Sequence, residues 1–198
     1  MKSRIARKYE MTSRAEAAEM TAKDILRAVG ALWVEGPVQE ITLDRVAEKA
    51  GVTVRTILRK YGSKEGLFHA AIAEDAAGIS AIKDKAEPGN LKLAVALLME
   101  EYEATGMAII RTLAIEHELP VASKILKNGR RSHRAWCERV FAPYLPARSH
   151  KTYPVLLGVL YAATDVGKWK LLRRDLGYSK KETEIIFLKT LEGIIRNK

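Results

Sequence analysis

The chain has almost no cysteine and no long apolar segment, and each shortage excludes a class of protein. Its 198 residues include one cysteine, Cys137, which excludes an intrachain disulfide and a zinc site built from several thiolates. The longest apolar run, residues 153–163, is much shorter than the roughly 20 residues of a membrane-spanning helix. No apolar stretch follows the charged N-terminus, as a secretory signal would require. We therefore expect a soluble, cytoplasmic protein with no membrane partner.

The sequence also lacks the motifs of the common enzyme classes. It contains no glycine-rich phosphate loop, no HExxH, no CxxC and no nucleophile elbow. Its histidines, at positions 69, 117, 133 and 150, are scattered along the chain. We expect no catalytic residues, no metal site and no cofactor, and hence a protein that is not an enzyme.

The alternation of polar and apolar residues that is typical of β-strands is nearly absent, whereas helical periodicity is frequent. The sequence predicts an all-α protein with short helices in residues 1–70 and a bundle of longer helices in residues 71–198. A capping box at Ser13–Glu16 indicates the start of the first helix, and Thr42, Thr53 and Ser63 are expected N-caps of the next three. The expected helices are 13–35, 43–50, 54–61, 64–85, 91–117, 121–144, 150–175 and 180–196.

The charge is strongly positive, and it is concentrated in one segment. The net charge of +10 and pI near 9.7 favour a nucleic acid or an anionic membrane surface as partner. Between Gly51 and Lys64 the charged residues are four Lys or Arg, with no acid among them. Surface helices usually mix both signs, because opposite charges three or four residues apart stabilise each other. This segment is therefore suited to an external polyanion.

The segments 43–50 and 54–61, separated by three residues, predict a helix-turn-helix. Ala47 is small enough for the second helix to cross closely, and Gly51 can adopt the left-handed conformation that ends the first helix. This arrangement leaves Val54, Arg55, Leu58 and Arg59 on the outer face, where they can enter a major groove. The alternative is a basic, solvated helix pair within a larger bundle.

The residues that carry this pattern resemble the N-terminal domain of the tetracycline-repressor (TetR) family of transcriptional regulators. The matching positions are Thr42, Val46-Ala47, Ala50-Gly51-Val52-Thr53, Thr56-Ile57, Tyr61, Ser63-Lys64-Glu65 and Leu67. The resemblance implies an N-terminal helix-turn-helix domain at 1–70 and an effector-binding and dimerisation domain at 71–198.

The resemblance also implies roles for single residues. It puts Thr42, Thr56, Lys60 and Lys64 on DNA phosphates. Arg55 and Arg59 are the candidates for base edges, because arginine to guanine is the commonest specific pairing. The full set of residues expected at the DNA is Thr42, Thr53, Val54, Arg55, Thr56, Leu58, Arg59, Lys60, Tyr61 and Lys64.

Two positions depart from the family pattern. Lys60 replaces the usual histidine and keeps a positive charge for phosphate. Leu58 replaces the usual tyrosine, so either it contacts a thymine methyl group or that contact is absent.

Two further basic segments have alternative interpretations. The first eight residues are either an arm for the minor groove or a solubilising tail. The run 124–139, in which Glu138 is the only acid, is either a solvated helix face or a contact for an anionic ligand or DNA.

In the C-terminal half, residues 167–195 resemble the family's final helix pair, and two apolar stripes suggest a four-helix dimer interface. The alternative is that the stripes serve only the monomer's core. The expected interface is Val155, Val159, Ala162, Val166, Ile185, Leu188, Leu191 and Ile195. The expected effector pocket is Met99, Tyr102, Met107, Trp136, Phe141, Tyr144 and Tyr161, each of which could instead be ordinary core.

Together these features predict a ligand-responsive regulator that binds a palindromic double-stranded operator as a homodimer. Repression with release by a small-molecule effector follows from the resemblance alone. The alternative is a basic helical adaptor or membrane-surface protein without sequence-specific DNA recognition.

Overall fold

The computed structural model describes residues 2–83 and 85–197, with side chains for 16–74 and 85–197. Within these residues every regular element is a helix, which confirms the predicted all-α fold. The chain divides into two compact units, Met1–Glu74 and Asp75–Lys198, and each is described by itself below. No described helix is both long and apolar enough to cross a membrane.

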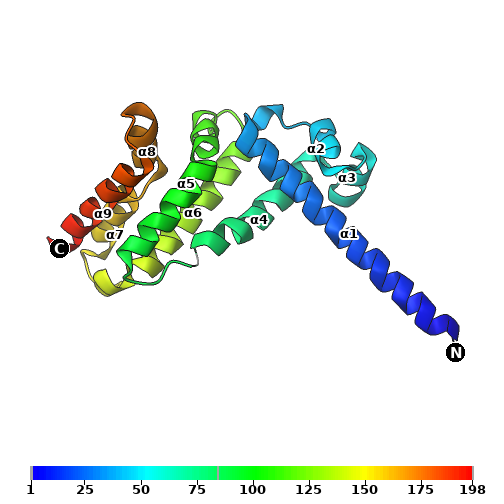
Figure 1. Cartoon of the computed structure of the whole chain (residues 1–198), viewed down its shortest axis with the longest axis horizontal. Helices are drawn as coiled ribbons and strands as arrows, with labels where there is room; N and C mark the ends of the chain where they lie inside the picture. Colours follow the sequence, from blue (N-terminus) through cyan, green and yellow to red (C-terminus); the bar gives the residue numbers. More distant parts are fainter. Residues whose placement is uncertain (1, 84, 198) are drawn as a thin grey trace. The chain divides into compact units, whose positions relative to one another are not determined.

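The N-terminal unit is built on α1 (Lys2–Glu35), which packs against α2 (Leu43–Ala50), while α2 packs against α3 (Val54–Tyr61) (Figure 1). A short 3-10 turn, η1 (Val38–Glu40), joins α1 to α2, and α4 (Lys64–Lys83) begins in this unit. The buried residues of α1 recur at helical spacing, so one stripe of the helix covers the core. The core residues are Ile25, Ala28, Val29, Leu32, Trp33, Val38, Ile41, Val46, Ala47, Ile57, Leu67, Phe68 and Ala71.

The predicted start of the first helix at Ser13 is wrong, because α1 is continuous from Lys2 to Glu35. The sequence before Ser13 contains no proline or glycine, and most of its residues favour a helix, so nothing forces a boundary there. The first eight residues, interpreted above as either a minor-groove arm or a solubilising tail, have side chains that lie outside the described part.

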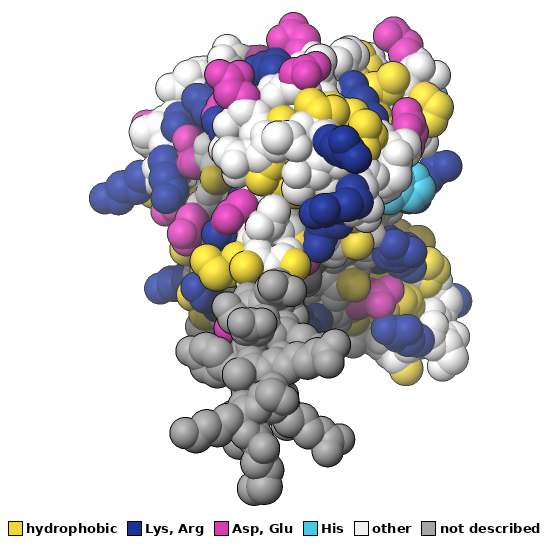
Figure 2. All heavy atoms as spheres, turned by 90° about the vertical axis from the view of Figure 1, so that its right-hand side faces the viewer, with side chains coloured by type: hydrophobic (Ala, Val, Ile, Leu, Met, Phe, Trp, Pro, Cys, Tyr) yellow, Lys and Arg dark blue, Asp and Glu magenta, His cyan; other side chains and the backbone are white. Residues whose placement is uncertain are grey.

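On the face drawn in Figure 2, the Lys and Arg side chains do not form a uniform basic surface. Figure 2 shows Lys and Arg side chains lying among Asp and Glu side chains on the face that it presents. Whether a given cation is free for a partner therefore depends on its own neighbours.

The C-terminal unit is a bundle in which α5 (Leu91–Ala114) contacts α6 (Pro120–Val140), α8 (Val166–Lys170) and α9 (Lys180–Arg196). The helix α7 (Tyr153–Ala163) packs against α6 and α9. A 3-10 turn, η2 (Ala142–Tyr144), follows α6, and a π-helical turn, η3 (Leu171–Asp175), follows α8. The largest buried side chains of the bundle are Leu98, Met99, Phe141, Leu157, Leu160, Trp169, Phe187 and Leu191.

The single helix predicted for 150–175 is instead three pieces. Pro154 favours a start at Tyr153, because proline suits the first turn of a helix. The first piece ends at Ala163, and the Asp165 side chain then accepts a hydrogen bond from Gly167 N at 2.8 Å and caps α8. The helix predicted for 121–144 likewise ends at Val140, just before the 3-10 turn that contains Pro143.

A close contact between α5 and α8 explains why Gly106 is a glycine. A Cβ atom at this position would lie 2.5 Å from the Trp169 ring, which is too close for any side chain. The indole ring of Trp169 is fully buried and lies against α5 at this residue, so a side chain at position 106 would force α8 away from α5.

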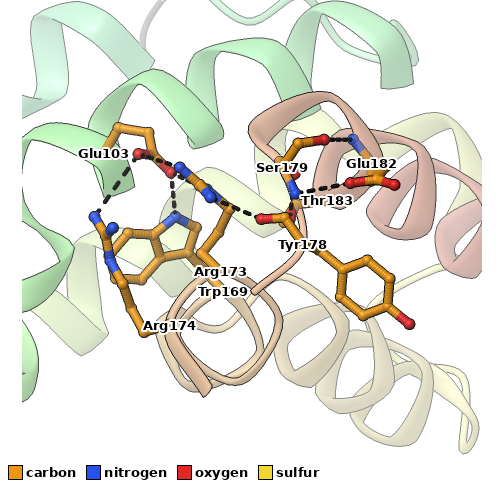
Figure 3. A network of polar contacts seen from close by, with 8 residues as sticks. All are labelled: Glu103, Trp169, Arg173, Arg174, Tyr178, Ser179, Glu182 and Thr183. Atoms are coloured by element: carbon orange, nitrogen blue, oxygen red, sulfur yellow. Dashed lines mark hydrogen bonds and ion pairs between the residues drawn. The ribbon is translucent and has the colours of Figure 1, made fainter. Parts of the chain in front are cut away.

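The same contact is held by a polar network at the edge of the bundle (Figure 3). Glu103 of α5 accepts hydrogen bonds from Trp169 Nε1 at 2.9 Å and from Arg173 Nε at 2.6 Å and Nη2 at 3.0 Å. Arg173 also donates to the carbonyl of Tyr178 at 2.7 Å, just before the capping box of Ser179 and Glu182 that starts α9. The Arg173 guanidinium holds the pKa of Glu103 below its usual value. One carboxylate thus joins α5, α8 and the start of α9.

Replacing Glu103 tests this network. Glu103→Gln keeps an acceptor for Trp169 but removes the charge that Arg173 pairs with, so we expect a loss of about 1–3 kcal/mol in the free energy of unfolding. Urea denaturation followed by circular dichroism measures it. The exposed pair of Lys23 and Glu19, in the other unit, gives the control: Glu19→Gln should cost much less, because water screens this pair. Equal effects would show that the network adds nothing to stability.

Lys168 of α8 is a half-buried cation without a carboxylate partner among the described residues. Its Nζ donates to Thr190 Oγ1 at 2.8 Å and lies 4.3 Å from the centre of the Phe187 ring. Burial lowers the pKa of Lys168 to about 8, because an apolar environment disfavours the charged amine.

This pKa implies a dependence of stability on pH. Between pH about 8 and 10.5 the unfolded chain keeps the Lys168 proton whereas the folded chain has lost it, so stability rises with pH in this window. We expect wild type to gain stability relative to Lys168→Met between pH 7 and 10, as measured by urea unfolding. Lys189→Met, on the exposed part of α9, controls for the loss of one charge. A difference that is constant with pH would contradict the lowered pKa.

Candidate nucleic-acid interface

The turn between α2 and α3 is built from backbone hydrogen bonds around Gly51. This residue has φ 65° and ψ 33°, the left-handed conformation that only glycine adopts without strain. Its N–H is directed at the carbonyls of Ala47 and Glu48, and Val52 N donates to Ala47 O at 2.9 Å. The turn therefore satisfies the last carbonyls of α2 and fixes the direction in which α3 leaves, as the sequence predicts.

The predicted caps are also present. Thr42 Oγ1 accepts a hydrogen bond from Arg45 N, and Thr53 Oγ1 accepts one from Thr56 N at 3.1 Å. Ser63 Oγ accepts one from Gly66 N at 3.0 Å at the start of α4. The Thr53 and Thr56 hydroxyls form a hydrogen bond with each other at 2.9 Å. This bond uses one of the two hydroxyl protons, so the other can be donated to an external acceptor.

The side of α3 opposite the core is exposed. Ile57 is fully buried between the helices, whereas Leu58 keeps 39% of its surface exposed and Arg55 and Arg59 are exposed too. Val54 and Thr56 are half-buried. An exposed leucine between two exposed arginines is a surface that can contact both bases and methyl groups.

The cations of this unit fall into two groups on either side of Gly51. Every Lys and Arg with a described side chain before Gly51 has a carboxylate within 4 Å: Lys23 with Glu19, Arg27 with Asp24, Arg45 with Glu40, and Lys49 with Glu35. After Gly51, within the described residues of the unit, Arg55, Arg59, Lys60 and Lys64 form no ion pair. The unpaired group lies on α3 and the first residue of α4.

Two of the residues expected at the DNA also contact α1. The Tyr61 hydroxyl donates to the Ala22 carbonyl at 3.4 Å, and burial raises the pKa of Tyr61. Lys60 Nζ lies 3.5 Å from the Ala18 carbonyl. Both side chains therefore help to hold α3 on α1, a contact that spacing along the sequence does not reveal.

The residues predicted to line an effector pocket lie in the C-terminal unit, and most belong to its core. Met99, Tyr102, Trp136 and Phe141 are buried in one cluster, and Tyr144 and Tyr161 pack against it half-buried. Met107 is 37% exposed and is not in that cluster. Sequence reasoning missed the polar side chains beside these rings, His133 and Thr164, which are both buried.

The residues predicted to form a dimer interface divide by exposure. Val155, Val159, Ala162 and Ile185 are exposed, with Val155 at 68%. Leu188 and Ile195 are half-buried. Val166 and Leu191 are buried in the core of their own unit. The exposed members come from α7 and α9, which contact each other.

These features define a helix-turn-helix protein with a separate helical C-terminal unit. Residues 18–71 match the model for bacterial regulatory proteins of the tetR family. No curated protein is significantly similar to the chain in sequence.

Solved structures of regulators share the fold of the chain. One is a transcriptional regulator from Rhodococcus sp. Rha1, with a TM-score of 0.65 at 15% identity over 91% of this chain and 96% of that one. Another, a candidate TetR-family transcriptional regulator from Mesorhizobium loti MAFF303099, gives 0.64 at 13% identity over 91% and 97%. Residues 18–71 therefore resemble the N-terminal region of tetR-family regulators, and the chain shares the fold of these solved structures.

Proposed function

We propose that this protein is a ligand-responsive repressor that reads a palindromic operator through α3. The observation that carries the proposal is the change in charge pairing at Gly51. Among the described side chains of the N-terminal unit, the cations before the turn have carboxylate partners, and those after it do not. Each unpaired cation can displace condensed counterions from DNA phosphates, which favours binding.

The exposed residues of α3 have separable roles in this proposal. Arg55 and Arg59 can reach base edges, where arginine pairs with guanine through two hydrogen bonds, and Leu58 can contact a thymine methyl group. Lys64, at the first residue of α4, is placed for a phosphate because a helix N-terminus also attracts anions. Thr42 and the Thr53–Thr56 hydroxyl pair supply further phosphate contacts.

The exposed apolar residues of α7 and α9 support a homodimer. Val155, Val159 and Ile185 expose between 42% and 68% of their surface, and exposed apolar residues on two neighbouring helices suit a partner helix pair. A second copy related by a two-fold axis would present the same surface. Two α3 helices one turn of DNA apart, about 34 Å, would then match a palindrome.

The C-terminal unit would bind a small molecule in the form that cannot bind DNA, changing the separation of the two α3 helices. A coupling free energy of about 1–3 kcal/mol is sufficient to switch operator occupancy. Repression, rather than activation, is proposed from the family resemblance.

Two substitutions separate base reading from phosphate binding. After an operator is selected from a random duplex pool, Arg55→Ala should relax the preference at one position and weaken operator binding by about 1–3 kcal/mol. Lys64→Ala should weaken all duplexes alike and flatten the slope of log K against log salt by about one unit. Fluorescence anisotropy at several salt concentrations measures both.

The matched control is Lys49→Ala. It removes the same charge from the same unit, but Lys49 lies 2.6 Å from Glu35, so the salt slope should stay close to that of wild type. An enriched inverted repeat would support the proposal, whereas a slope that falls equally in all three variants would contradict the assigned roles. Equal affinity for heparin and every oligonucleotide would contradict sequence-specific binding altogether.

Val155→Glu tests the dimer. Placing a charge on the exposed α7–α9 surface should convert a dimer into a monomer at micromolar concentration, as measured by light scattering, because the carboxylate would be buried against the second copy. Met20→Glu, which alters a residue 66% exposed in the other unit, should leave the dimer intact. A monomeric wild type would disprove the interface.

A further inference from the structure

A cluster of polar and aromatic side chains is enclosed between α6 and α7 in the C-terminal unit. The rings of His133 and Trp136 stack at 5.5 Å with an interplanar angle of 16°, and Tyr161 meets His133 edge-on at 4.7 Å. Phe141 packs edge-on against Trp136 at 5.7 Å. His133, Trp136 and Phe141 are buried, while Tyr161 is half-buried, so the cluster extends from the core towards the surface.

The other hydrogen-bond donors of the cluster already have acceptors within the protein. The Thr164 hydroxyl donates to the Leu160 carbonyl at 2.9 Å. Because a hydroxyl has one proton, His133 Nε2, 3.1 Å from Thr164 Oγ1, must be the donor of that contact. The Tyr102 hydroxyl donates to the Thr164 carbonyl at 2.8 Å. Each of these donors therefore has an acceptor within the protein.

The indole N–H of Trp136 is different. The residue is 4% exposed, and its Nε1 has no hydrogen-bond partner within the described part of the chain. Trp169, the other buried indole of the unit, donates to Glu103 at 2.9 Å. Buried indole N–H groups usually find a partner, so the Trp136 site holds a donor that the protein itself leaves unused.

We propose that Trp136 Nε1 donates to an oxygen of a bound small molecule, and that this molecule is an uncharged aromatic compound carrying a carbonyl group. An indole N–H can only donate, so it selects an acceptor and disfavours a cation. The arginines near Tyr161 are each paired, Arg130 with Glu116 and Arg134 with Glu138. An anion entering this site would therefore lose water without gaining a free countercharge.

The aromatic rings around Trp136 explain why we propose an aromatic ligand. Tyr161 and Phe141 already meet their neighbours edge-on, the geometry that aromatic pairs prefer, and a flat ligand can extend the same packing. The half-buried Tyr161 is the side from which a ligand would enter. This inference rests on the proposed ligand-responsive regulation and names the chemical class of its effector.

Matched probes test the site. Acetophenone has a carbonyl acceptor, ethylbenzene is its counterpart of similar size without one, and benzoate adds a negative charge. The three tryptophans of the full chain give three indole N–H signals in a nitrogen-15 correlation spectrum, which Trp→Phe variants assign. We expect acetophenone to move the Trp136 signal and ethylbenzene to move it much less, with benzoate binding more weakly than acetophenone.

Trp136→Phe keeps an aromatic ring but removes the unused donor together with part of the buried indole, so we expect it to fold with some loss of stability from the space left behind. It should bind acetophenone about 3- to 10-fold more weakly, the effect of one hydrogen bond, and ethylbenzene equally well. Trp33→Phe, in the N-terminal unit, should change neither affinity.

Three results would overturn the assignment. One is a Trp136 signal that responds equally to acetophenone and ethylbenzene. Another is tighter binding of benzoate than of acetophenone. The third is a water cross-peak to the Trp136 indole proton that persists at saturating acetophenone, which would assign the donor to a structural water. Operator binding is measured on the same samples without probes. A failed ligand assignment therefore does not contradict the DNA-binding proposal, and a failure of operator binding is detected separately from the ligand result.

Discussion

The backbone conformation at Gly51 sets the geometry on which the N-terminal unit depends. Its left-handed φ of 65° lets two N–H groups, its own and that of Val52, bond to the end of α2. Any other residue would pay a steric cost of roughly 1–2 kcal/mol at this position. Ile57 is then buried against α2, and Arg55, Leu58 and Arg59 are left outside. The exposed surface of α3 is therefore a consequence of how the turn is closed.

The unpaired cations cost the folded protein little, which explains how the fold can keep them. An exposed ion pair contributes only about 0–1 kcal/mol, so leaving Arg55 and Arg59 without carboxylates sacrifices little stability. The same groups gain much more beside a polyanion, because each phosphate contact releases a counterion. The paired cations already have an anionic partner within the unit, as Lys49 has in Glu35 at 2.6 Å. Charge pairing thus separates the cations that have a partner within the fold from those that remain available to an external anion.

The parts of the fold that sequence analysis predicted are those decided by neighbours in the chain. Caps at Thr42, Thr53 and Ser63 depend on residues two or three positions away, and the turn at Gly51 depends on one residue with unusual freedom. The wrong start at Ser13 has the same origin, because a valid capping signal does not end a helix whose preceding residues also favour one. Local signals identify what a segment can form, and continuity with its surroundings decides whether it does.

The features that escaped prediction depend on contacts between distant segments. Helical periodicity predicted both Val155 and Leu191 as residues of the dimer interface, yet Val155 is 68% exposed and Leu191 is fully buried. The reason is that a stripe of apolar residues does not identify the element that covers it. The break after Ala163 belongs to the same category, since Thr164 bonds to His133 of another helix. A pattern of apolar residues does not predict which polar side chains are buried, so the polar groups between α6 and α7 could not be found from the sequence.

The two units therefore encode recognition by different physical means. The exposed surface of α3 consists of donors and charges on one short helix, and binding to a polyanion through such a surface relies on many weak, screened contacts and is sensitive to salt. The cluster around Trp136 is shielded from water, so a single hydrogen bond there is stronger and a single unmet donor is more costly. A regulator that joins such units can vary its ligand by substituting a few buried side chains while the turn and α3 remain unchanged. The difference follows from solvent exposure: Arg55 is exposed to water, whereas Trp136 is only 4% exposed.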